Sequence, residues 1–483
     1  MNPLPVLPVR VELQEGDVEQ LLALNIVHKS ILYAFYAGSL FAIAFLVLRT
    51  KLIPQPVLAA MPWSARIAPE RFSRRAWIIM AGSALATGAV IGGVTLFVCE
   101  VVLDVFGERL DVDTRAWAIA AFSGVCLAIV NLWRASWLRR IAAVLSAVLF
   151  LATAALGINA GYGLNTTLGE LLDISNYRHL TLPKLIPKGV RRDSEALWKT
   201  WRAPAGMRSQ GDSGLVTIPA SASGFKARDA FLYLPPAALV AEPPNLPVLI
   251  MMMGQPGGPQ QAKLAVPQLD AYAQAHHGLA PIVLTVDQLG DPYKNPLCID
   301  SARGRVYTYV TSDVVNFVRS RLNVSSDRKQ WAVGGYSNGG ECSLAFGAKR
   351  PDLFGSILDM SGEIEPRDGS VVNTLRAGFG GNQRKFDAEK PANILRKHHY
   401  RDEVAVFTSG GLDKYYTKDA NTAAADARAV GMTVYRMIGA GVDHRSSAIV
   451  FGAQVGLPLL GDRFGLSPVG GPGSPGPLIR KPV

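Results

Sequence analysis

The sequence predicts a four-helix transmembrane domain followed by an α/β domain whose mostly parallel sheet is covered by helices on both faces. Two observations predict this: long apolar runs fill the first 161 residues, and short β-rich runs alternate with helical patterns after residue 224. The composition agrees with both. With 49% hydrophobic and 18% charged residues, the 483-residue chain is apolar for a soluble protein but too polar to consist of membrane helices alone.

Four apolar runs predict the membrane domain, at residues 30–48, 76–103, 116–133 and 141–161. Each has about 18 or more largely uncharged residues, enough to cross roughly 30 Å of hydrocarbon. The first run begins too late for a cleaved signal peptide and lacks an early basic region. No run carries a pair of ionisable residues that would line an ion path, so we expect an anchor and not a transporter.

Charges in the connecting loops predict the orientation. The loops at 49–75 and 134–140 are rich in arginine, whereas the intervening loop at 104–115 is mostly acidic. The positive-inside rule places the two basic loops in the cytoplasm and the α/β domain on the extracytoplasmic side. Five basic residues after the fourth run argue mildly for the opposite orientation: Arg178, Lys184, Lys188, Arg191 and Arg192.

The net charge of +11 and the four cysteines exclude several classes of protein. Because no Lys/Arg run or basic stripe interleaved with aromatic residues is present, we expect no nucleic-acid partner, and spread charge near an anionic membrane surface fits better. Four cysteines are too few for a disulfide scaffold. The absence of CxxC and CxxCH pairs predicts no metal, haem or redox centre, and we expect no metal and no organic cofactor.

The chain is expected to divide into four parts. Residues 1–161 form the four-span anchor, 162–224 a linker or cap, 225–466 the α/β domain, and 467–483 a disordered Pro/Gly-rich tail. The linker has apolar residues that could serve as a lid or as a collar at the membrane surface. Seven strands are expected in the α/β domain, at residues 230–234, 248–253, 282–286, 331–333, 356–359, 404–408 and 433–438.

The most informative motif is Gly-Tyr-Ser-Asn-Gly at residues 335–339. It follows an apolar strand and precedes a helical pattern, which is the context of a nucleophile elbow. Such a turn holds its serine in a strained conformation, and Gly335 and Gly339 remove side chains that would clash with neighbouring backbone. The helix start adds N–H groups near the reacting atom. Ser337 is therefore the predicted nucleophile.

A serine nucleophile needs a base, and the base needs an orienting carboxylate, in the chain order Ser, Asp/Glu, His for this kind of fold. His444 is the last histidine in the chain and lies between a predicted strand and the last helix; a surface loop histidine is the alternative interpretation. Asp413 follows a predicted strand within a Gly-rich turn, where α/β sheets display functional groups. Ser337, Asp413 and His444 form the predicted triad, with Asp359 and Glu363 as alternative acids.

Two backbone N–H groups should stabilise the oxyanion that forms during acyl transfer. Asn338, directly after the nucleophile, is expected to supply one. The second is expected from the turn after the strand at 248–253, where Gln255 is the preferred donor and Gly254 the next, because Pro256 has no N–H. The alternative is a flexible Gly/Pro turn without a catalytic role.

Residues 225–460 resemble the esterase D family of α/β-hydrolases, the group that includes the mycolyltransferases of actinobacterial envelopes. Four motifs carry the resemblance, in the order MMMGQPGG, GYSNGG, GGLD and VDH. With the preceding apolar runs, the whole chain resembles membrane-anchored esterases of actinobacteria. The resemblance implies an α/β-hydrolase fold and an acyl ester substrate. The turn at Met253-Gly254 departs from the histidine-glycine start common in esterases, which bears on the second oxyanion donor.

The α/β domain contains two of the cysteines, Cys298 and Cys342, the second of them five residues after the predicted nucleophile. On the extracytoplasmic side they could form a disulfide, and two separate buried thiols are the alternative. Cys99 and Cys126 fall in apolar runs and are expected to be packing residues.

These features predict a membrane-anchored serine esterase that hydrolyses an acyl or aminoacyl ester of a membrane or envelope lipid through an acyl-enzyme. Its expected partners are the lipid-borne ester and the bilayer. One alternative is an acyltransferase of mycolyltransferase type that moves the acyl group to a sugar or glycerol hydroxyl. A non-catalytic envelope-binding module is the alternative from another class, and the complete triad order argues against it.

Overall fold

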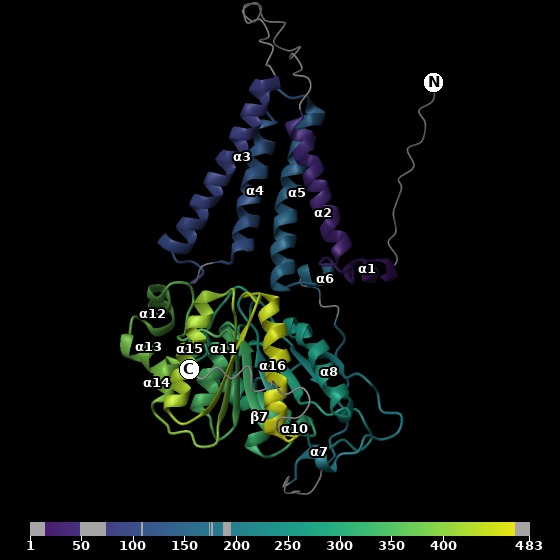
Figure 1. Ribbon diagram of the computed structural model, residues 1–483, viewed down its shortest axis with the longest axis vertical. Coiled ribbons are helices and arrows are strands. Elements are labelled where there is room, and N and C mark those ends of the chain that lie inside the picture. The colour runs from purple at the N-terminus through teal and green to yellow at the C-terminus, as the bar shows by residue number, and fades with distance from the viewer. Residues whose placement is uncertain are drawn as a thin grey trace, which may run out of the picture. The chain divides into compact units, whose positions relative to one another are not determined.

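The structure is a computed structural model, and it describes residues 15–48, 74–107, 110–172, 174, 177–186 and 195–468 (Figure 1). These residues divide into two compact units. One comprises Met1–Thr95 and Asp113–Tyr177, and the other comprises Leu96–Val112 and Arg178–Val483.

The first unit is built on four long apolar helices, as the sequence predicted. They are α2 (Lys29–Val47), α3 (Arg74–Phe97, continued by a π turn at Val98–Val102), α4 (Val112–Val130) and α5 (Trp137–Tyr162). Among the described residues these four are long and apolar enough to cross a membrane, with mean hydropathies between 1.4 and 2.5. Two short helices, α1 (Glu15–Leu22) and α6 (Leu168–Leu171), complete the unit.

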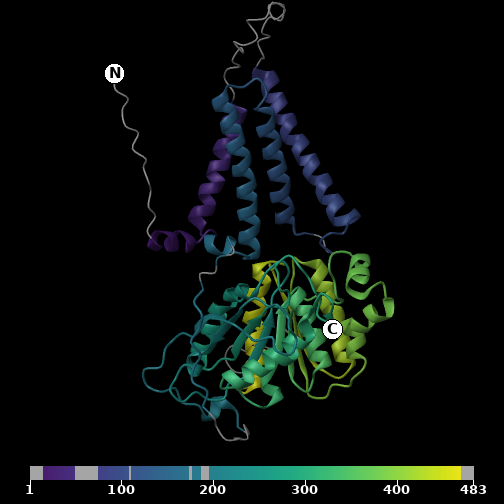
Figure 2. The same ribbon diagram turned by 180° about the vertical axis from the view of Figure 1, so that it is seen from behind.

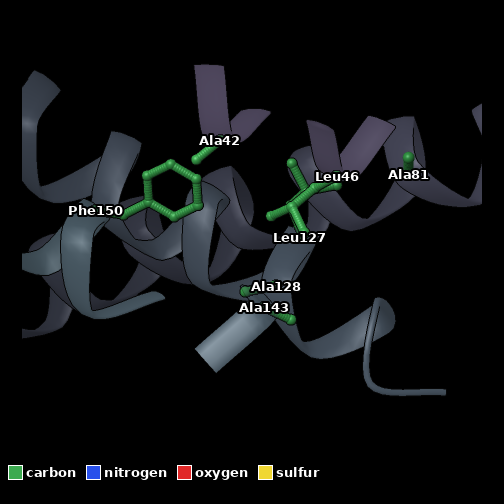
Figure 3. Close-up of a cluster of buried hydrophobic side chains, with 7 residues drawn as sticks. All are labelled: Ala42, Leu46, Ala81, Leu127, Ala128, Ala143 and Phe150. Carbon is green, nitrogen blue, oxygen red and sulfur yellow. The ribbon is translucent and has the colours of Figure 1, made fainter. Parts of the chain in front are cut away.

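Small residues let these helices pack closely. A cluster of buried side chains joins them: Ala42, Leu46, Ala81, Leu127, Ala128, Ala143 and Phe150 (Figure 3). A Cβ on Gly88 of α3 would lie 2.5 Å from the carbonyl oxygen of Phe122 in α4, so the two backbones touch at this glycine. Close packing of this kind holds helices together where lipid supplies no hydrophobic driving force.

The second unit contains an eight-stranded sheet in the order β1-β2-β4-β3-β7-β8-β9-β10. Its strands are β1 (Asp212–Val216), β2 (Ala230–Leu234), β3 (Val248–Met252), β4 (Ile282–Val286), β7 (Trp331–Tyr336), β8 (Ser356–Met360), β9 (Val404–Gly410) and β10 (Thr433–Gly439). Six neighbouring strands, β4, β3, β7, β8, β9 and β10, are parallel to one another. At one edge β2 runs antiparallel to β4, and β1 runs antiparallel to β2. A separate hairpin is formed by β5 (Asp300–Ser301) and β6 (Gly304–Arg305).

Helices cover both faces of this sheet (Figures 1 and 2). On one face α8 (Val266–Ala275) packs against α16 (Ser446–Phe464), and on the other α14 (Pro391–Leu395) packs against α11 (Asn338–Lys349) and α15 (Lys414–Ala429). Every residue of β3, β4, β7, β8 and β9 is consequently buried. The remaining helices are α7 (Leu197–Thr200), α9 (Val306–Thr308, continued by a π turn at Tyr309–Val314), α10 (Val315–Arg321), α12 (Val371–Phe379) and α13 (Gln383–Glu389).

Seven of the eight strands of the main sheet lie where the sequence predicted them, and β1 falls in the segment expected to be a linker or cap. Two other residues of that segment, Ile186 and Trp201, lie at the amino end of the parallel strands. Ile186 donates its N–H to Oδ1 of Asn323, before β7 (3.0 Å), and the indole of Trp201 donates to the carbonyl of His277, before β4 (2.9 Å). Ile186 and Trp201 therefore lie away from Ser337, which follows the other end of β7. The stretch after β1 instead leads to the carboxyl end of the sheet, where Val216 pairs with Ala230.

The disorder expected for residues 467–483 falls outside the described residues except at Ser467 and Pro468. Ser467 is 4% exposed, and its hydroxyl donates to Oδ1 of Asp462 in α16 (2.6 Å). This residue therefore belongs to the packed α/β unit.

Candidate active site

Ser337 lies in a strained turn between β7 and α11. Its backbone has φ +55° and ψ −119°, a conformation that a residue with a side chain rarely adopts. Glycines flank it two residues away on each side. A Cβ at Gly335 would overlap the carbonyl group of Gly339, and a Cβ at Gly339 would overlap the carbonyl group of Met252. The turn is therefore packed directly against the end of β3.

The structure brings Ser337, His444 and Asp413 into one hydrogen-bonded row. Because a carboxylate only accepts, the Nδ1–H of His444 donates to Oδ2 of Asp413 (3.0 Å), and the hydroxyl of Ser337 donates to Nε2 of His444 (3.0 Å). The three residues follow the carboxyl ends of β7, β10 and β9. Neither alternative acid, Asp359 or Glu363, takes this place, because Nδ1 of the histidine is paired with Asp413.

Two tyrosines that the sequence did not single out hold the histidine. Tyr416 stacks on the imidazole of His444, with ring centroids 3.6 Å apart and planes 8° apart. Tyr336 lies 5.1 Å from the imidazole at 31°, and its hydroxyl donates to the backbone carbonyl of His444 (3.0 Å). Tyr336 belongs to the elbow motif, so its place beside the nucleophile was visible in the sequence, whereas its contact with a distant loop was not.

The residues predicted to form the oxyanion hole lie beside the nucleophile. Asn338 begins α11, where backbone N–H groups have no acceptor within the helix. The turn after β3 passes close to the serine, since a Cβ on Gly254 would lie 3.1 Å from the Cβ of Ser337. Gln255 comes next, and its side-chain oxygen accepts a hydrogen bond from Nδ2 of Asn295 (2.8 Å). The geometry therefore places both predicted donor segments beside Ser337.

A buried glutamine, which the sequence analysis missed, joins these two segments. Gln288 is 3% exposed, and its Nε2 donates to the carbonyl of Met253 (2.5 Å) and to Oδ1 of Asn338 (3.0 Å). The carbonyl of Met253 and the N–H of Gly254 belong to one planar peptide unit, so this bond also orients that N–H. One sequence signal could have pointed to Gln288: it comes just after β4, and β4 is the neighbour of β3 in the sheet.

A buried arginine fixes the turn that carries Asp413. Arg436 on β10 is 9% exposed, and its guanidinium donates to Oγ of Ser409 (2.5 Å) and to the carbonyl of Thr417 (3.3 Å). The hydroxyl of Thr417 donates in turn to the carbonyl of Gly410 (2.8 Å). Burial lowers the pKa of Arg436 to about 10, so the group remains charged at neutral pH. These bonds link β9, β10 and α15 around the acid turn.

A disulfide between Cys298 and Cys342 joins the loop after β4 to α11. The same loop carries Asn295, the residue that holds the side chain of Gln255. Glu341 lies beside the bridge, and its carboxylate and the two sulfur atoms form the one group of three close ligand atoms found in the described part of the chain. With both sulfurs bonded to each other, this group offers no metal site.

Burial raises the pKa of two carboxyl groups near the nucleophile. Glu341, in the first turn of α11, is 1% exposed, and burial raises its pKa to about 8. Asp359, at the end of β8, is also 1% exposed, and burial raises its pKa to about 7 against the opposing effect of a hydrogen bond from the N–H of Gly362. Keeping such groups buried makes the stability of the fold depend on pH.

The Esterase family model, described as "Putative esterase", matches residues 224–446. An uncharacterized protein of Corynebacterium glutamicum is 32% identical over 319 residues, which are 62% of this chain and 72% of that protein. Among solved structures, a ferulic acid esterase is similar with 15% identity over 53% of this chain and 99% of its own, at a TM-score of 0.45. An S-formylglutathione hydrolase from Agrobacterium tumefaciens has 16% identity, covers 53% and 97% of the two chains, and gives a TM-score of 0.44.

Replacing Glu341 with glutamine should flatten the dependence of stability on pH. The folded state holds the Glu341 proton up to about pH 8, whereas the unfolded chain releases it near its ordinary value of 4.5, so stability is lost as pH rises between these values. The full loss is on the order of 5 kcal/mol. Melting of the purified full-length protein in detergent, followed between pH 5 and pH 9, measures it.

The exposed Glu242 provides the matched control. Glu242→Gln should melt like the parent at every pH. The melting temperature of Glu341→Gln should exceed that of the parent by a margin that grows up to about pH 8 and then stays constant. Parallel melting curves for the parent and Glu341→Gln would show that the carboxyl group does not titrate in this range.

Proposed function

The chain belongs to the Esterase family and is a serine hydrolase, and on this premise we propose that Ser337, His444 and Asp413 hydrolyse an acyl or aminoacyl ester of a membrane or envelope lipid. The observation that carries the catalytic assignment is the row of two hydrogen bonds, each 3.0 Å long, that joins the three side chains. In this geometry the aspartate orients the histidine, and the histidine can act as a general base on the serine hydroxyl.

The reaction follows from these contacts. Ser337 Oγ attacks the ester carbonyl carbon while its proton passes to Nε2 of His444, and Asp413 stabilises the imidazolium that forms. The N–H groups of Asn338 and Gln255 receive the negative oxygen of the tetrahedral intermediate. The intermediate collapses as the imidazolium gives its proton to the leaving alcohol, and an acyl-enzyme remains. Water then repeats the sequence and releases the acid, so no electron donor or further reactant is needed.

The lipid nature of the substrate is inferred from the four apolar helices on the same chain. A hydrolase tethered to a bilayer meets lipid-borne esters at a high effective concentration, without needing tight binding of a dissolved molecule. The loop charges support an extracytoplasmic position for the hydrolase unit, with the bilayer as its partner.

We favour hydrolysis over acyl transfer because nothing in the triad or in the described part of residues 162–224 requires an acceptor sugar. Transfer requires water to be excluded while an acceptor hydroxyl is bound in line with the acyl carbonyl. Ile186 and Trp201 of that segment contact Asn323 and His277 at the amino end of the strands, so these two residues lie away from the acyl-enzyme. A non-catalytic binding module is disfavoured because the hydrogen bonds of a complete triad are formed.

Substitution of the triad residues tests the assignment. On a short-chain aryl ester, Ser337→Ala and His444→Ala should each lower kcat by about a million-fold and should not be additive. Asp413→Asn should lower kcat about ten-thousand-fold, because the histidine remains but loses its orientation. Asp359→Asn is the matched control, a buried acid on the neighbouring strand, and should stay within about threefold once folded protein is normalised. Loss of activity in Asp359→Asn but not in Asp413→Asn would make Asp413 the wrong acid.

Cysteine labelling tests the orientation. In a Cys99→Ser, Cys126→Ser background, Glu242→Cys in an exposed loop of the hydrolase unit should react with an impermeant thiol reagent on intact cells. Arg71→Cys, in a loop predicted to be cytoplasmic, should react only after the cells are permeabilised. The reverse pattern would place the hydrolase in the cytoplasm.

Product analysis separates hydrolysis from transfer. The purified protein in detergent, given a labelled acyl ester with millimolar trehalose or glycerol, should release mainly free acid because water reaches the acyl-enzyme. Chromatography of the labelled products measures the ratio. A larger amount of acylated trehalose or glycerol than of free acid would identify the chain as an acyltransferase.

A further inference from the structure

One ring face of the catalytic histidine is covered by an aromatic side chain. The rings of Tyr416 and His444 lie nearly parallel, at 3.6 Å and 8°, which is a fully stacked arrangement. Tyr416 is 3% exposed and the histidine side chain 12% exposed, so little water screens the contact. An electron-rich ring face this close attracts a cation on the partner ring.

The same residue also contacts the catalytic acid. Asp413 is the N-cap of α15, and its Oδ1 accepts the backbone N–H of Tyr416 (3.2 Å). The other carboxylate oxygen, Oδ2, remains directed to Nδ1 of His444 (3.0 Å). Tyr416 thus orients the carboxylate through its backbone and the imidazole through its ring.

Hydrogen bonds made by the next residue in the chain fix the position of this tyrosine. The next residue, Thr417, shares a hydrogen bond with Ser409 of β9 (2.8 Å) and donates to Gly410 (2.8 Å), and Arg436 donates to Ser409. The first turn of α15 therefore cannot shift relative to the strand end. The tyrosine ring is presented to the histidine by a rigid element and not by a mobile loop.

We propose that Tyr416 is a positioning residue of the triad, whose ring fixes the plane of the His444 imidazole and stabilises the imidazolium that forms when Nε2 takes the proton of Ser337. The attraction between ring and cation exists only once the charge develops, so it lowers the barrier without tightening substrate binding. The inference rests on the proposed hydrolase activity and adds a residue to it.

A second tyrosine–histidine stack in the same unit provides a matched control. Tyr272 and His276 of the α8 region stack with centroids 4.0 Å apart and planes 20° apart, and Tyr272 is 6% exposed. Its replacement removes a buried tyrosine from a similar pair that lies outside the triad. Tyr272→Leu therefore reports the general cost of losing such a stack.

Steady-state kinetics of the full-length protein in detergent, on a short-chain aryl ester, test the proposal. Tyr416→Leu keeps the backbone N–H and an apolar side chain but loses the ring, and should lower kcat about tenfold with KM changed less than twofold. Tyr416→Phe removes only the hydroxyl and should retain kcat within twofold. Tyr272→Leu should lower the melting temperature but leave kcat of the folded enzyme within twofold.

A double variant tests whether Tyr416 and Asp413 act on the same histidine. In an Asp413→Asn background the imidazole has already lost its orientation, so adding Tyr416→Leu should lower kcat by less than a further twofold. The rate at which a fluorophosphonate labels Ser337 should follow kcat in all variants.

Three results would overturn the assignment: an unchanged kcat in Tyr416→Leu, an equal loss in Tyr416→Phe, or an equal loss in Tyr272→Leu. Failure of the proposed function looks different, because the parent would then show no ester hydrolysis beyond that of Ser337→Ala. In that case all the tyrosine variants would match the parent at this background rate.

Discussion

The candidate active site depends on two positions that only glycine fits. A Cβ at Gly335 or Gly339 would overlap backbone atoms, those of Gly339 and of Met252 respectively, so β3, β7 and α11 meet backbone to backbone. This contact places the turn after β3 beside Ser337. It also forces the serine to φ +55°, a strain of about 1–3 kcal/mol that the surrounding sheet must hold. The serine N–H donates to Met360 (3.0 Å), which ties the strained residue to the adjacent strand.

Each remaining part of the site comes from a different loop and has its own support. Asp413 caps α15 above the buried Arg436, His444 is held by Tyr416 and Tyr336, and the donor turns are joined by Gln288. Side chains fixed in this way need little reorganisation when charge develops, which is the main source of electrostatic catalysis. Among the described residues the triad bonds are already formed, so catalysis does not require a loop closure to assemble them.

The sequence allowed prediction of the parts whose signals are local. Glycines two residues either side of a serine, after an apolar strand, define the elbow without any long-range information. Asp413 and His444 could be paired because parallel strands end at one edge of the sheet, which brings their loops together. The four long apolar helices could be predicted because length and hydropathy alone define them.

The missed features depend on contacts between distant segments. Tyr416 is one of two adjacent tyrosines, and only the helix geometry after the Asp413 cap decides which of them meets the imidazole. The role of Gln288 depends on the register of β4 beside β3. The strand β1 begins with Asp-Ser-Gly, a poor strand signal, and pairs only because β2 offers it an open edge. No local pattern could show that the preceding segment contacts Asn323 at the far end of the sheet.

The proposed membrane anchoring and the chemistry act on different steps, which is why soluble esters can serve as probes of the chemical step. A tether raises the local concentration of a bilayer-borne ester and so acts on encounter. The chemical step depends only on interactions that strengthen in the transition state, and those of Ser337, His444, Asp413 and the two donors all lie within the second unit. A short aryl ester lacks the lipid portion yet presents the same carbonyl to the same groups. Differences in kcat between triad variants on such an ester therefore report on the chemistry and do not depend on the identity of the natural substrate.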